Sequence, residues 1–120
     1  MKRLLAVALL AVLALAPTVS AQDQHQTSKA NISFSTPVVV GTATLSPGRY
    51  QVQCRMIDGQ HVMVILQKGK EVARIPCTPV TLDSKVDETG YRTILREDVR
   101  VLTEIRIKGE TVGHKLATVN

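Results

Sequence analysis

Apolar and polar residues alternate along several stretches of this chain, and that period of two constrains the fold more than any other feature. The clearest run is 99–108, where every second residue from Val99 to Ile107 is apolar or Thr. Successive side chains of a strand point to opposite faces, so this pattern predicts strands with one buried face. No stretch keeps the three-to-four spacing of an amphipathic helix over more than about two turns. The pattern therefore predicts an all-β protein.

The first 21 residues have the composition of an export signal. Two basic residues precede an apolar run of 12 residues that ends at Leu15, and the small residues Ser20 and Ala21 suit a signal peptidase. The run is shorter than the roughly 20 residues that a membrane-spanning helix needs. We expect residues 1–21 to be a signal peptide, and the exported chain to be periplasmic or extracellular with no integral membrane segment.

The 99 residues after Ala21 form one domain at most. They include 31 Val, Ile and Thr against ten Leu and Ala, which favours strands, and their 13 basic and 10 acidic residues give a mild charge of +3. Residues 22–30 contain a single apolar residue, so we expect a flexible N-terminal arm there. Residues 31–120 are predicted to form one all-β domain.

Turn signals divide this domain into about seven to eight strands. Asp58-Gly59 fits a two-residue hairpin turn, and residues 68–70 form the next turn. If Gly69 is left-handed in a three-residue loop, Ile75 lies opposite Met63 on one apolar face, which is the register that we predict. A new strand is expected to start at Val80, beyond two prolines.

We therefore expect a single small antiparallel sandwich or barrel, and the sequence leaves the choice between them open. The residues predicted to form its core are Val52, Met63, Ile65, Ile75, Val101, Ile105 and Ile107.

Three motifs resemble those of a family of short exported bacterial all-β proteins of unknown function. The chain has a G-x-x-x-L-x-x-G-x-Y-x-V opening at residues 41–52, a K-G-K hairpin at residues 68–70 and a late L-x-E-I strand at residues 102–105. The resemblance implies an exported β domain and brings no catalytic residues with it. The motif L-x-P-G-x-Y-x-V also occurs in other β sandwiches, so it does not assign a function.

Two cysteines in an exported chain raise the question of a disulfide. In a flat meander Cys54 and Cys77 share a face but lie two strands and two residues apart, about 11 Å, beyond the limit of about 7 Å for a bridge. Strong coiling of the sheet would shorten this distance. The sequence leaves a disulfide and two buried free thiols as alternatives.

No set of residues in the sequence predicts catalysis, a metal ion or a cofactor. His25, His61 and His114 lie far apart without paired spacing, and we predict ordinary surface histidines. The acidic residues of 83–88 do not match an EF-hand loop. No serine lies in a G-x-S-x-G setting, so we expect a protein that is not an enzyme.

A basic, amide-rich face is the candidate binding surface. Its residues are Arg49, Gln51, Gln53, Arg55, Lys68, Lys70 and Arg74. Such a face suits an anionic polymer, while the scarcity of aromatic residues disfavours stacking on sugars or bases.

The sequence thus predicts a non-enzymatic binding or structural accessory protein of the cell envelope, with another envelope protein or an anionic polymer as partner. A module that recruits another chain through an exposed strand edge, as partner or homodimer, is the alternative. A carrier of a small ligand inside a barrel is a third hypothesis. The chain is expected to be a monomer or a homodimer.

Overall fold

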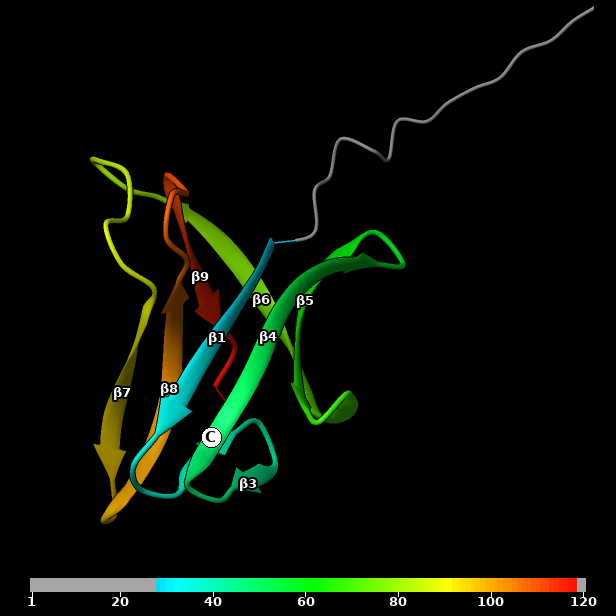
Figure 1. Cartoon of the computed structure of the whole chain (residues 1–120), viewed down its shortest axis with the longest axis vertical. Coiled ribbons are helices and arrows are strands. Elements are labelled where there is room, and N and C mark those ends of the chain that lie inside the picture. Colours follow the sequence, from blue (N-terminus) through cyan, green and yellow to red (C-terminus); the bar gives the residue numbers. More distant parts are fainter. Residues whose placement is uncertain (1–27, 119–120) are drawn as a thin grey trace, which may run out of the picture.

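The computed structural model describes residues 28–118, and the predicted signal peptide lies outside these residues. The described part of the chain contains nine strands and no helix (Figure 1). The strands are β1 (Ser28–Phe34), β2 (Val38–Val40), β3 (Ala43–Leu45), β4 (Gly48–Ile57), β5 (Gln60–Gln67), β6 (Lys70–Thr81), β7 (Gly90–Arg96), β8 (Val99–Arg106) and β9 (Val112–Leu116).

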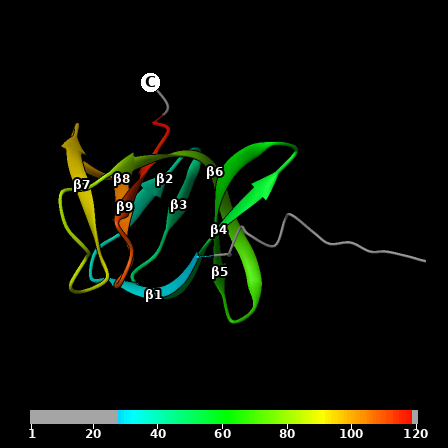
Figure 2. The same cartoon turned by 90° about the horizontal axis from the view of Figure 1, so that it is seen from above.

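All nine strands belong to one mostly antiparallel sheet that curls around a core without closing into a barrel. Its order is β1-β4-β5-β6-β9-β8-β2-β3, and β7 pairs with the other side of β8. Figure 2 shows β4 and β5 on one side of the molecule, β8 and β9 on the other, and β6 passing between the two sides. The predicted class, a single small all-β domain, is confirmed, with one more strand than the sequence indicated.

The long strand β6 makes the corner of the fold. The sequence suggested a break at its two prolines, but β6 continues through Pro76 and Pro79 to Thr81. Its first half pairs with β5 and its second half, from Cys77 onward, pairs with β9. A strand that changes partner in this way links the two sides of a curled sheet.

The predicted register of the β4–β5–β6 meander is confirmed. Met63 pairs with Cys54 and Ile75, and the turn at Asp58-Gly59 is a two-residue hairpin with both residues at positive φ. We expected the extra residue that sets this register to lie in a three-residue loop at residues 68–70, but it does not. The loop after β5 has two residues, and the register shifts within β6 instead, which leaves Val72 exposed.

A second irregularity, in β8, breaks the period of two that the sequence shows over residues 99–108. The pairing of β7 with β8 shifts so that Arg92 pairs with Glu104 and Thr93 with Leu102. The side chain of the extra residue, Thr103, donates a hydrogen bond to the carbonyl of Arg92 (3.2 Å). A bulge reverses the alternation on one side of it. Leu102 is therefore buried, and Val101, which we predicted to be in the core, is only half-buried.

The core lies inside the curl and contains the other six residues predicted for it. Its buried members are Ile32, Phe34, Val38, Val40, Leu45, Tyr50, Val52, Cys54, Met63, Ile65, Ile75, Cys77, Leu102, Ile105, Ile107 and Leu116. Apart from His114, the buried side chains of the described residues are apolar or thiols.

Two of the three edge strands, β1 and β7, approach each other. Phe34 packs edge-on against Tyr91 with ring centroids 4.9 Å apart, and the Tyr91 hydroxyl donates a hydrogen bond to the Ser33 carbonyl (3.1 Å). Beyond this contact the β7–β8 hairpin carries exposed apolar side chains at Ile94, Leu95 and Val99. An edge that carries exposed apolar side chains is a candidate contact for another chain.

The N-terminal boundary of the domain is earlier than the sequence indicated. β1 begins at Ser28, so residues 28–30, expected in a flexible arm, pair with residues 52–54 of β4. Backbone pairing needs no apolar side chain, and the composition of this segment therefore did not reveal it. Residues 22–27 lie outside the described part. Within residues 28–118 there is no helix with the length and hydropathy to cross a membrane.

Candidate metal centre

The two cysteines meet in the core. Their Sγ atoms lie 3.9 Å apart, as two thiols without a bond between them, although Cys54 is on β4 and Cys77 on β6. Our flat-sheet separation of about 11 Å was wrong because the sheet curls over β5 and both side chains point inward. Each residue is less than a tenth exposed.

The pairing of β6 with β9 brings a histidine to the same place. Cys77 pairs with Leu116, and His114 lies two residues from Leu116 on the same strand and face. One ligand atom of Cys54, one of Cys77 and one of His114 all lie within 4.8 Å of one another. In the part of the chain that the structure describes, this is the one group of three or more such residues.

A second histidine reaches the cluster from β5. His61 pairs with Met56, and its Nδ1 lies 3.8 Å from Cys54 Sγ. His61 is half-buried, and Met56 beside it is 48% exposed, so these two residues lie at the solvent-facing side of the cluster. From the sequence we expect ordinary surface residues at both positions. His114 is instead buried.

The ring of His114 is held by a carboxylate. Its Nε2 lies 2.7 Å from Glu110 Oε1, while its Nδ1 is buried without a hydrogen-bond partner. The loop that carries Glu110 is fixed by backbone bonds, since Glu110 donates to the Ile107 carbonyl and accepts from the Val86 amide. A histidine that binds a metal through one nitrogen commonly donates from the other to a carboxylate. His114 and Glu110 have this arrangement.

Two distances within the cluster match edges of a tetrahedral site. With metal–sulfur bonds of about 2.3 Å and metal–nitrogen bonds of about 2.0 Å, the edges of a tetrahedron are about 3.8 Å between two sulfurs and about 3.5 Å between sulfur and nitrogen. The observed 3.9 Å between the two sulfurs and 3.8 Å between Cys54 Sγ and His61 Nδ1 are close to these values. A metal ion fits among Cys54, Cys77 and His114, whereas His61 lies outside this group of three and would have to move closer to become a fourth ligand.

The electrostatics of the cluster favour one thiolate. A hydrogen bond from the Cys77 thiol, helped by the two histidines, outweighs burial and lowers the pKa of Cys54 to about 4. The same hydrogen bond, together with burial and repulsion from Cys54, raises the pKa of Cys77. Burial disfavours the charged form of His114, but Cys54 and Glu110 together outweigh it and raise its pKa. The thiolate is the form in which sulfur binds metal.

The sequence offered only weak signals for this centre. Cys54 and Cys77 were singled out as a pair, but His61, Glu110 and His114 join them only through the curl of the sheet. One local signal was present, because Glu110 and His114 are four residues apart, Glu110 just after a turn and His114 on the strand that follows. That spacing carries no meaning until the turn and the strand after it are known.

Four residues of the predicted basic face lie together on the outer side of β4 and β6. Gln51, Gln53 and Arg55 form a hydrogen-bonded row, in which Arg55 Nε donates to Gln53 Oε1 (2.9 Å) and Gln53 Nε2 to Gln51 Oε1 (2.7 Å). Arg74 is neutralised by a two-pronged ion pair with Glu71 (2.8 Å). The face is therefore less basic than its composition suggested.

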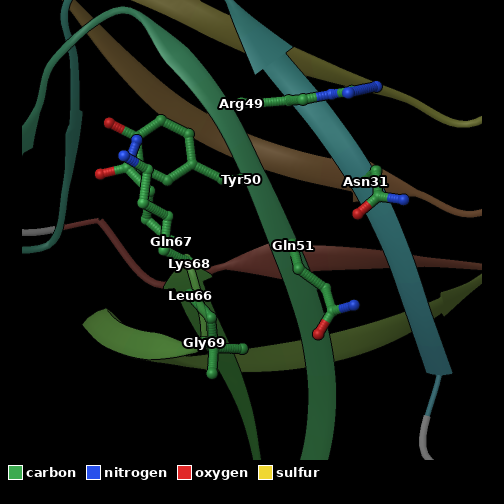
Figure 3. A pocket seen from close by; sticks show the side chains of 8 residues that line it. All are labelled: Asn31, Arg49, Tyr50, Gln51, Leu66, Gln67, Lys68 and Gly69. Atoms are coloured by element: carbon green, nitrogen blue, oxygen red, sulfur yellow. The ribbon is translucent and has the colours of Figure 1, made fainter.

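The other basic residues lie around the nearby turns. Arg49 and Lys68 line a shallow hollow of about 570 Å³ together with the amides of Asn31, Gln51 and Gln67 (Figure 3). Lys70 starts β6 and is exposed. Figure 3 shows that Arg49 and Gln51 project from β4 on the side away from Tyr50, a core residue that also borders the hollow, and neither cysteine lines it.

Compared with known proteins, the chain matches no family model, no curated protein and no solved structure. The resemblance to short exported bacterial proteins stays a prediction.

Proposed function

We propose that this chain is an exported, non-enzymatic binding domain that holds a soft metal ion at Cys54, Cys77, His61 and His114. One observation carries the proposal. Two thiol sulfurs and a histidine nitrogen lie within 4.8 Å of one another in the core, and the buried Nδ1 of that histidine has no hydrogen-bond partner. A buried polar atom without a partner is costly, and a bound metal ion would supply one.

The ligand types favour Zn²⁺ or Cu⁺. Thiolate and imidazole are the preferred ligands of these ions, whereas Mg²⁺ and Ca²⁺ prefer oxygen. Two sulfurs and two nitrogens in a tetrahedral arrangement suit Zn²⁺ in particular. Cu⁺ is the competitor, because it accepts the same sulfurs and also tolerates three ligands.

The number of ligands supports a binding role rather than catalysis. Catalytic zinc sites commonly use three protein ligands and keep a fourth position for water or substrate. Here three almost fully buried side chains come together, and we propose that His61, whose Nδ1 lies 3.8 Å from Cys54 Sγ, moves closer to fill the fourth position. We propose that the protein stores, buffers or passes on metal in the envelope, or uses it to stabilise the fold.

The test is a metal titration of the full chain, expressed with its own leader and purified under reducing conditions. We expect one Zn²⁺ per chain, and expect Co²⁺ to give the intense visible bands of a tetrahedral ion with a thiolate charge-transfer band. The variants Cys54→Ser, Cys77→Ser and His114→Gln should each weaken binding strongly. Asp83→Asn, which removes an exposed carboxylate outside the cluster, is the matched control. Absence of tight Zn²⁺, Co²⁺ and Cu⁺ binding by the folded, reduced chain would overturn the proposal.

A second candidate function is binding of an anionic polymer at the hollow between β1, β4 and β5. The observation that favours it is the gathering of Arg49, Lys68 and three amides around that hollow. Binding of an acidic polysaccharide that weakens with salt, and that falls in the double variant Arg49→Ala/Lys68→Ala, would support it. Equal binding by the wild type and this variant would remove it.

A further inference from the structure

The two sulfurs of the centre can also react with each other. Their distance of 3.9 Å suits two ligands of one metal ion, but a disulfide needs a separation of about 2.0 Å. A movement of about 2 Å therefore converts one state into the other. Both cysteines cannot bind the metal as thiolates and form a disulfide at the same time, so the two states exclude each other.

We propose that the Cys54–Cys77 pair is a reversible thiol–disulfide switch that sets whether the centre holds metal. The reduced pair binds the ion, and oxidation releases it. This inference rests on the proposed metal-binding function and names the regulation of that same site. The sequence left free thiols and a disulfide as alternatives for these two cysteines. In the switch, both are working states of the same pair.

The oxidant is a disulfide supplied from outside, either a small one such as oxidised glutathione or that of a dithiol oxidoreductase. The sulfur of one cysteine attacks a sulfur of the external disulfide and forms a mixed disulfide, which releases the first external thiol. The second cysteine then attacks, closes the Cys54–Cys77 bond and releases the second thiol. Two electrons pass from the pair to the external disulfide, whose two sulfurs leave as thiolates and take up protons from water or from any cysteine that is still a thiol.

The solvent-facing side of the cluster gives the oxidant its route. Cys54 lies on the same face of β4 as Met56, two residues away, and the neighbouring His61 is half-buried. Met56 is 48% exposed, whereas Cys54 and Cys77 are 8% and 7% exposed. The pair is thus shielded on the core side and approachable near the β4–β5 turn. We expect the sulfur of Cys54 to attack the external disulfide first, because it is nearer to this side.

Oxidation removes two of the three ligands that lie together in the core. His61 and His114 remain, with Glu110 bound to the far side of the His114 ring. Loss of an outer-shell partner alone weakens metal sites by about 10- to 100-fold, so we expect loss of both thiolates to weaken Zn²⁺ binding by more than about 100-fold.

The experiment uses the full chain purified in the reduced form and loaded with Zn²⁺. Oxidised glutathione is then added, and free thiols, released Zn²⁺ and disulfide formation by mass are followed together. We expect two thiols to disappear for each Zn²⁺ released, and a reductant to restore both thiols and binding. A chain that keeps its Zn²⁺ after the disulfide has formed, or that never forms the disulfide, would refute the switch.

Two variants separate this proposal from the proposed function. His114→Gln weakens the metal site but keeps both sulfurs, so it should still form the disulfide. Cys77→Ser cannot close the bond and should stop at a mixed disulfide on Cys54. Tight Zn²⁺ binding without disulfide formation would refute the switch alone. A folded, reduced chain that binds none of the three metal ions would refute the switch together with the metal function.

Discussion

Removing the carboxylate behind His114 tests the geometry of the centre without touching a ligand. Glu110 Oε1 lies 2.7 Å from Nε2, and the His114 side chain is only 5% exposed, so the carboxylate both orients the ring and makes it a better donor to metal. Outer-shell partners of this kind contribute about 10- to 100-fold to metal affinity, which is about 1.4 to 2.8 kcal/mol. Glu110→Gln keeps an acceptor oxygen and loses the charge, so we expect about a tenfold loss of Zn²⁺ affinity. Glu110→Ala loses both, and we expect about a hundredfold loss.

The assay is competition for Zn²⁺ between the reduced chain and a chelator of known affinity. Glu71→Gln is the matched control, because Glu71 is an exposed carboxylate that pairs with Arg74 on the outer face. It should leave the affinity unchanged. If Glu110→Ala stays within about twofold of the wild type, the carboxylate–histidine–metal arrangement is wrong.

Three further predictions concern the thiols, the core and the exposed edge. In the metal-free chain Cys54 should be a thiolate at pH 7 and lose its charge near pH 4, seen as loss of thiolate absorbance; two neutral thiols at pH 7 would contradict this. Because the folded pKa of Cys54 is lowered from 9.0, its contribution to stability is present above pH 9 and is lost as the pH falls through about 4. In thermal or denaturant unfolding, Ile105→Ala, at a fully buried side chain, should cost about 2 to 5 kcal/mol, whereas Leu95→Ala, at a side chain 62% exposed, should change stability by less than about 0.5 kcal/mol. If the β7 edge forms a homodimer, light scattering should show association at high concentration that Leu95→Lys abolishes, and a strict monomer in the wild type would remove that alternative.

Much of the local structure followed from the sequence. The period of two and the β-branched composition predicted an all-β domain, and Gly59 and Gly69, both at positive φ, marked two of the hairpin turns. The β4–β5–β6 register followed because a slip by one residue would have exchanged Ile75 for Arg74 in the core. These features depend on near neighbours along the chain, and the amino-acid pattern encodes them directly.

The corner, the bulge and the centre depended on the tertiary structure. Nothing local shows that β6 continues past its prolines to pair with β9, or that Thr103 is the extra residue that moves Leu102 rather than Val101 into the core. The same long-range pairing unites Cys54, Cys77 and His114 from three strands, far apart in sequence. The alternation of side chains determines which face of each strand is buried. Which other strands pack against that face depends on how the whole sheet curls. The pattern could therefore predict buried thiols, but only the curl of the sheet placed a histidine and its carboxylate beside them.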